Sequence, residues 1–341
     1  MADFSSLLTP PRQYDASAME LPRLEIGPGI DDWRRQAQSL RDKWSGFLGH
    51  GPEIMPTNIE FRDAEDLADV TRTLISYDVE KGHRVEAYLM APKGDGPYPG
   101  IVVFHPTTNT TIDQPVGFGT RPTLQFGLNL ARCGYVTLSP RNYIWDYCGQ
   151  KATEWEQYAE NAALVKKRWP AWSGMGKMVW DGLRAADVLC ELPMVDASRL
   201  GCIGHSLGAK EALYATALDQ RMKAGISCEG GVGKTFTNWD APWYLGPEFA
   251  KRIDLDHHQL LALAAPRALM VIGGGLEPSH RPEGTGPGAD GILTWNYIEA
   301  ARPAYALYEA GDRLGYLLHD QGHSLPAAHE HFVYEWFERF I

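Results

Sequence analysis

The pattern of hydrophobic and polar positions differs between successive parts of the chain. Within residues 31–48, five apolar side chains recur at helical spacing, which predicts an amphipathic N-terminal helix. Residues 68–91 contain two β-rich runs separated by a short polar turn, a pattern typical of an antiparallel hairpin. The chain therefore begins with a helix and a hairpin before its main pattern starts.

From residue 99 onward, short apolar runs alternate with helical patterns. The runs lack polar alternation, which is typical of parallel strands that are buried on both faces. This predicts an α/β fold with a mostly parallel sheet that helices cover on both faces. The expected strands are 101–105, 135–140, 200–206, 224–228, 268–274 and 314–320, and the expected helices are 121–133, 173–191, 207–218, 293–310 and 326–341.

Two long, aromatic-rich segments, residues 141–172 and 229–257, interrupt this alternation. Both follow the carboxyl ends of predicted strands, where open α/β sheets bind their ligands. We expect these two insertions to form a lid or a pocket wall.

Composition narrows the range of partners. The 341 residues include 43 acidic and 32 basic side chains, for a net charge of −11, and the basic ones are scattered, which disfavours a nucleic-acid partner. No apolar stretch reaches the roughly 18 residues of a membrane span, and the N-terminus lacks the pattern of a signal peptide. We expect a cytoplasmic protein, or a periplasmic or secreted one if a signal peptide has been removed. The oligomeric state, including a homo-oligomer, stays open.

The five cysteines form an odd set without CxxC spacing, which argues against a disulfide framework and a zinc site. The histidine pairs at 257–258 and 329–331 also lack the spacing of a helical metal pair. We therefore expect neither a metal nor another cofactor.

The strongest chemical signal is the sequence GHSLG at residues 204–208, between a predicted strand and a predicted helix. Small residues on both sides of a serine permit the tight nucleophile elbow that exposes a hydroxyl at the top of a sheet. Ser206 is the candidate nucleophile, and it needs a base to remove its proton. His323 follows the last predicted strand and is the candidate base.

Three carboxylates compete for the third member of a catalytic triad. Glu229 ends the strand after the nucleophile helix, whereas Asp290 and Glu277 lie in the loop after the next strand. Enzymes of this architecture commonly hold the acid in that later loop, but a strand-end carboxylate in a glycine-rich turn can be kept ionised by backbone N–H groups. Glu229 is preferred, with Asp290 as the main alternative.

An oxyanion hole in such a site uses the N–H of the residue after the nucleophile and an N–H from the loop after the first parallel strand. The first donor is Leu207. In the loop, Pro106 has no N–H, so Thr107 is the second candidate donor.

These motifs resemble the α/β-hydrolase superfamily, in its dienelactone hydrolase and acetyl xylan esterase-like branch, with similarity to glucuronoyl esterases. The resemblance covers residues 85–341. With the helix predicted near the N-terminus, we expect an N-terminal helical extension at 1–60 and an α/β-hydrolase domain at 61–341. The segments that carry the resemblance are GHSLGAKEAL (204–213), SCEGGVG (227–233), FTNWDAPWYLG (236–246) and RLGYLLHDQGHS (313–324).

The resemblance also implies roles for individual residues. Glu229 matches the acid of glucuronoyl esterases, and Lys210 matches a lysine that contacts sugar hydroxyls in those enzymes. Leu207 departs from them, because an arginine that stabilises the oxyanion occupies that position there, and this puts a uronic-acid substrate in doubt. Trp239 and Trp243 are expected to line the mouth of the site.

Arg141 follows a predicted strand and is a candidate to bind a substrate carboxylate or an internal aspartate such as Asp146. Together, the residues predict a serine carboxylic-ester hydrolase that acts through an acyl-enzyme on Ser206. The expected substrate is a small-molecule or saccharide ester, with a carbohydrate-linked, aromatic or small acyl group. The alternative is an amidase or peptidase-like serine hydrolase, and a non-catalytic ligand-binding protein is disfavoured because no triad member is missing.

Overall fold

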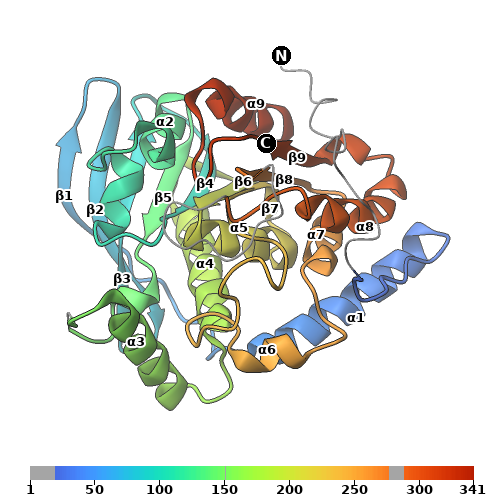
Figure 1. The fold of residues 1–341 in the computed structure, drawn as a ribbon. Coiled ribbons are helices and arrows are strands. Elements are labelled where there is room, and N and C mark those ends of the chain that lie inside the picture. Colours follow the sequence, from blue (N-terminus) through green and yellow to red (C-terminus); the bar gives the residue numbers. More distant parts are fainter. Residues whose placement is uncertain (1–19, 150, 276–287) are drawn as a thin grey trace.

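The computed structural model describes residues 20–149, 151–275 and 288–341. Within this part of the chain, nine strands form one sheet in the order β1-β2-β3-β5-β4-β6-β7-β8-β9, with helices on both faces (Figure 1). The strands are β1 (Glu60–Asp66), β2 (Val70–Glu80), β3 (His83–Pro92), β4 (Tyr98–Phe104), β5 (Val136–Pro140), β6 (Val195–His205), β7 (Met222–Cys228), β8 (Ala268–Gly273) and β9 (Leu314–Leu318).

The sheet has a parallel part and an antiparallel edge. Strands β5, β4, β6, β7, β8 and β9 are parallel, as the apolar runs predicted. The predicted hairpin is confirmed in β2 and β3, and β3 joins the parallel part through antiparallel pairing with β5. Strand β1 pairs with β2 and was not predicted, because all seven of its residues are exposed and leave no hydrophobic pattern.

Neighbouring residues of the central strand β4 point to opposite faces of the sheet. Ile101 and Val103 pack in a hydrophobic cluster with α2 and α9, whereas Val102 and Phe104 pack in a cluster with α4 and α5. The fold therefore has three layers, with helices on both faces of a mostly parallel sheet, as predicted. The helices are α1 (Ile30–Leu48), α2 (Phe126–Arg132), α3 (Glu154–Arg168), α4 (Gly174–Glu191), α5 (Leu207–Leu218), α6 (Pro247–Lys251), α7 (His258–Ala264), α8 (Thr294–Ala306) and α9 (Glu330–Phe340).

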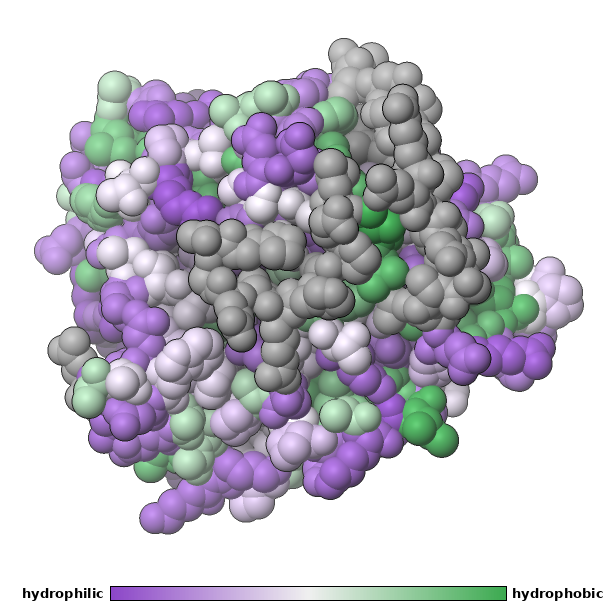
Figure 2. All heavy atoms as spheres, in the orientation of Figure 1, coloured by the Kyte–Doolittle hydropathy of each residue, from purple (hydrophilic) through white to green (hydrophobic). Residues whose placement is uncertain are grey.

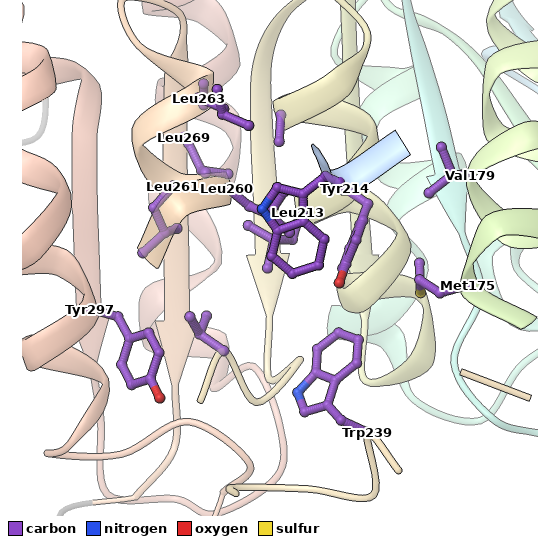
Figure 3. Close-up of a cluster of buried hydrophobic side chains, with 14 of the residues drawn as sticks. Met175, Val179, Leu213, Tyr214, Trp239, Leu260, Leu261, Leu263, Leu269 and Tyr297 are labelled. Atoms are coloured by element: carbon purple, nitrogen blue, oxygen red, sulfur yellow. The ribbon is translucent and has the colours of Figure 1, made fainter. Parts of the chain in front are cut away.

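The N-terminal helix α1 packs into the main core. Its Trp44 is fully buried, and the ring lies 5.6 Å from that of Tyr214 on α5. Figure 3 shows this region, in which side chains of α4, α5 and α7 meet around Tyr214 and Trp239. In the part of the chain that the structure describes, no helix combines the length and apolar character needed to cross a bilayer.

Both insertions are packed against the same core. The first contains α3, which begins with a capping box formed by Thr153 and Glu156, and the second contains α6. Tyr158 of α3 and Trp243 of the second insertion are buried in the core cluster of α5 and α7. Outside this core, the face drawn in Figure 2 is mostly hydrophilic, with hydrophobic residues interspersed. Through Tyr158 and Trp243, both insertions therefore pack against the core of the molecule.

Candidate active site

Ser206 lies in the sharp turn between β6 and α5. Its backbone angles are φ 59° and ψ −114°, and its N–H donates to the carbonyl of Cys228 on β7 at 2.9 Å. A positive φ is costly for a residue other than glycine and is found where the surrounding structure enforces it. This is the backbone conformation of a nucleophile elbow.

The two glycines of the GHSLG motif permit this turn because the backbone segments approach very closely. A Cβ atom on Gly204 would lie 2.2 Å from the carbonyl carbon of Gly208. A Cβ atom on Gly208 would lie 2.2 Å from the carbonyl oxygen of Phe104 at the end of β4. Neither position accommodates a side chain without a backbone shift, so the motif has a packing reason as well as a chemical one.

His323 and Glu229 approach each other from different strand ends. Glu229 follows β7 with φ 61°, and its Oε2 lies 3.3 Å from Nδ1 of His323, which follows β9. The same oxygen accepts hydrogen bonds from the N–H groups of Ala289, at 2.6 Å, and Asp290, at 3.4 Å. The carboxylate is thus held against the imidazole by backbone donors.

The alternative acid, Asp290, has other partners. Its carboxylate accepts hydrogen bonds from the N–H groups of Gly231 and Val232, both at 2.7 Å, and from the hydroxyl of Thr294 at 2.9 Å. These contacts hold the glycine-rich turn after Glu229 in place. Glu277, the third candidate, lies outside the described residues.

Burial governs the protonation of this pair. It lowers the pKa of His323 to about 4, with smaller contributions from Arg121 and Lys210, so the imidazole is neutral at neutral pH and able to accept a proton. Burial, together with the neighbouring Asp290, raises the pKa of Glu229 well above its ordinary value, although hydrogen bonds from the backbone N–H groups of Ala289, Asp290 and Gly274 oppose the shift. A positive charge developing on the imidazole favours the ionised carboxylate.

Two residues that sequence reasoning did not assign hold the loop of His323. The guanidinium of Arg121 donates to the carbonyl of His323 at 3.0 Å. His319 accepts the N–H of Gln321 at its Nδ1, so its Nε2 carries a proton and donates to the carbonyl of Ser324 at 3.0 Å. The contact of Arg121 joins residues far apart in the sequence, and those of His319 depend on the local turn. No sequence motif predicts either.

A cavity of about 290 Å³ joins these groups to the aromatic insertions. It lies at the carboxyl ends of the parallel strands, as expected for this fold. Side chains missed in the sequence, Tyr158, Thr237 and Asn238, contribute to it. The cavity is lined by Thr107, Trp155, Tyr158, Ser206, Lys210, Glu229, Gly230, Thr237, Asn238, Trp243, Tyr244, Ala289 and His323.

Lys210, one turn into α5, contributes a buried amine to this lining. Its Nζ donates to the carbonyl of Gly230 and to the hydroxyl of Thr237, both at 2.5 Å. Burial lowers its pKa to about 7, and the carboxylate of Asp290 opposes that shift. The amine lies 3.8 Å from the centre of the Trp239 ring.

Two predicted substrate-binding residues lie outside the lining that the described residues form. Trp239 is 1% exposed, donates its indole N–H to the carbonyl of Gly231, and packs against the amine of Lys210. Arg141 forms an ion pair with Glu86 at 2.9 Å and lies 3.9 Å from Asp146. The structure therefore favours the second of the two partners expected for Arg141, an internal aspartate, and adds Glu86.

The candidate oxyanion donors are Leu207 and Thr107. Leu207 is the first residue of α5, a position whose N–H has no partner within a helix. Thr107 follows β4 and lines the cavity. The N–H groups of both residues are therefore candidates to face a substrate oxygen bound at Ser206.

Comparison with known proteins agrees with this geometry. Residues 85–242 match the model of the dienelactone hydrolase family. Over these residues the chain is similar to that family. A Bacillus subtilis protein named as a hydrolase, YtaP, is 27% identical over 240 residues, which cover 66% of this chain and 77% of YtaP.

Glucuronoyl esterases are also similar to this chain, in sequence and in structure. A 4-O-methyl-glucuronoyl methylesterase of Sodiomyces alcalophilus is 32% identical over 125 residues, or 29% of this chain and a quarter of that protein. The solved structure of a glucuronoyl esterase from Solibacter usitatus has a TM-score of 0.71 at 17% identity, with 96% of this chain and 98% of that chain covered. At that identity, the structural likeness shows the shared α/β-hydrolase fold.

Proposed function

We propose that the chain is a serine carboxylic-ester hydrolase that forms an acyl-enzyme on Ser206. The observation that carries the proposal is the strained elbow conformation of Ser206 beside a cavity that also contains His323, with Nδ1 of His323 3.3 Å from Glu229. A nucleophile, a base and a carboxylate that orients the base are the three groups that acyl transfer requires.

In the proposed reaction, Ser206 Oγ attacks the acyl carbon of the ester while Nε2 of His323 takes the hydroxyl proton. Glu229 holds Nδ1 of the imidazole and stabilises the imidazolium. The N–H groups of Leu207 and Thr107 bind the oxyanion, and the imidazolium then protonates the leaving alcohol. Water, activated by the same histidine, releases the acid and restores the serine.

We infer that the substrate is a saccharide ester or an ester with a small or aromatic acyl group. The cavity volume of about 290 Å³ is near the lower limit for small-molecule sites. Aromatic faces from Trp155, Tyr158 and Trp243 suit a sugar ring or a flat acyl group, and Lys210 and Asn238 offer polar contacts to hydroxyls. The names of the methylesterase and esterase relatives support the same substrate class.

The test is a panel of esters assayed with the native protein and with Ser206→Ala. The panel contains 4-nitrophenyl acetate, an acetylated xylo-oligosaccharide, the methyl ester of a glucuronic acid and a hydroxycinnamoyl ester, with a matched anilide. We expect hydrolysis of at least one ester, loss of that activity in Ser206→Ala, and covalent labelling of Ser206 by a fluorophosphonate. Equal rates in the two proteins, or faster cleavage of the anilide, would overturn the proposal.

A further inference from the structure

His105 directly follows the last residue of β4, next to the proposed oxyanion loop, and it is 1% exposed. Both ring nitrogens have backbone partners. Nε2 lies 3.0 Å from the N–H of Asn142, and Nδ1 lies 2.8 Å from the carbonyl oxygen of Pro106. Because the amide of Asn142 can only donate and the carbonyl of Pro106 can only accept, the neutral ring carries its proton on Nδ1.

This hydrogen bond fixes the orientation of one peptide group. The carbonyl of Pro106 and the N–H of Thr107 belong to the same planar unit, and in a trans peptide they point in opposite directions. Holding the carbonyl against the His105 ring therefore turns the Thr107 N–H away from that ring. Thr107 lines the cavity that contains Ser206, so the orientation of its N–H determines whether it can serve an oxyanion there.

The partner on the other side of the ring is itself anchored to the nucleophile helix. The side-chain amide of Asn142 donates to Oε1 of Glu211 at 2.9 Å, and both side chains are buried. Glu211 lies on α5, the helix that Leu207 begins. A continuous chain of hydrogen bonds thus runs from α5 through Asn142 and His105 to the loop of Thr107.

We propose that His105 is a positioning residue that orients the Thr107 N–H as an oxyanion donor. The inference rests on the proposed function, because it concerns the transition state of acyl transfer. The ring of Trp145, 5.1 Å away, packs against His105 and belongs to the first aromatic insertion. Burial lowers the pKa of His105 to about 4, so the neutral tautomer persists at neutral pH.

Three substitutions at His105 distinguish the contributions of its two ring hydrogen bonds. In His105→Asn, the side-chain amide reaches the position of Nδ1 and can donate to Pro106. In His105→Gln, the longer side chain reaches the position of Nε2 and can accept from Asn142. His105→Phe keeps the ring volume and removes both bonds.

We expect kcat on the best ester of the panel to fall about 10- to 100-fold in His105→Phe, with KM changed by less than about 3-fold. His105→Asn should recover most of the lost kcat, and His105→Gln should not. The affinity for a boronic acid transition-state analogue should fall by the same factor as kcat/KM, which a purely structural role would not produce.

The matched control is His258→Phe. His258 is a buried residue of α7, and its Nε2 likewise lies 2.8 Å from a proline carbonyl, that of Pro22. It should lower Tm without lowering kcat. Recovery in His105→Gln but not in His105→Asn, or an unchanged kcat in folded His105→Phe, would overturn the inference. If Ser206→Ala retained full activity, the proposed function itself would fail instead.

Discussion

Replacing Glu229 with glutamine tests the acid of the proposed triad. The substitution preserves the volume of the side chain and leaves an oxygen that can accept the N–H of Ala289, now 2.6 Å from Oε2. It removes the negative charge that lies 3.3 Å from Nδ1 of His323. The neutral base remains in place, but the imidazolium that forms as Ser206 loses its proton is no longer stabilised by a carboxylate.

The distance sets the size of the expected effect. Two unit charges 3.3 Å apart attract by about 5 kcal/mol at an effective dielectric constant of about 20. Because 1.36 kcal/mol is a factor of ten in rate, the loss corresponds to a fall in kcat of about three to four orders of magnitude. The His323 side chain is 30% exposed, and solvent screening reduces the effect toward the lower value.

The assay measures kcat and KM of Glu229→Gln on the best ester, together with Tm. Asp290→Asn is the matched control, since it neutralises the neighbouring buried carboxylate that contacts Gly231, Val232 and Thr294. In this variant the asparagine NH₂ group would face a backbone N–H donor, so we expect the free energy of unfolding to fall by about 1–3 kcal/mol. We expect the loss of kcat to be much smaller than in Glu229→Gln. A near-normal kcat in Glu229→Gln, with a collapse in folded Asp290→Asn, would refute the reasoning.

Three further outcomes follow from the site. The pKa of His323, lowered to about 4, keeps the base neutral above that pH. We therefore expect kcat/KM, measured from pH 3.5 to 8, to fall only near pH 4, and a midpoint near 6.5 would contradict this. Gly208→Ala should lower the free energy of unfolding by about 1–3 kcal/mol and reduce kcat, because its Cβ would lie 2.2 Å from the Phe104 carbonyl; a native Tm and rate would count against it. Trp243→Ala should raise KM for aryl or sugar esters, whereas Arg141→Ala should leave KM unchanged because its partners lie away from the cavity. Equal KM values for the two variants would remove Trp243 from the substrate site.

The main layers of the fold were predictable because their signal is local. Apolar runs without polar alternation marked the parallel strands, and the nucleophile helix was predicted over the residues that α5 occupies, Leu207–Leu218. The antiparallel edge strand β1 lacks such a signal, because its stability comes from backbone pairing with β2 rather than from buried side chains. Helix α3 was missed inside the first insertion, although Thr153 and Glu156 carry the sequence signature of its capping box.

The choice between Glu229 and Asp290 could not be made from spacing alone. Both residues follow parallel strands, and both are fully buried near backbone donors. What separates them is the direction of each side chain, which depends on the positive φ of Glu229 and on contacts across the sheet. The pairing of Arg141 with Glu86 likewise depends on the antiparallel register of β3 and β5, which no sequence pattern specifies.

The tryptophans of the two insertions divide between the surface of the cavity and the layer behind it. Trp243 lines the cavity, whereas Trp239 lies under Lys210 and Trp145 packs against His105. The second layer therefore contacts Lys210, which we propose to bind the substrate, and His105, which we propose to orient the oxyanion loop. We therefore expect substrate specificity to depend on how the insertions pack as well as on the residues that line the cavity. For the same reason, the aromatic content of the sequence indicated where the cavity lies but could not assign a role to each tryptophan.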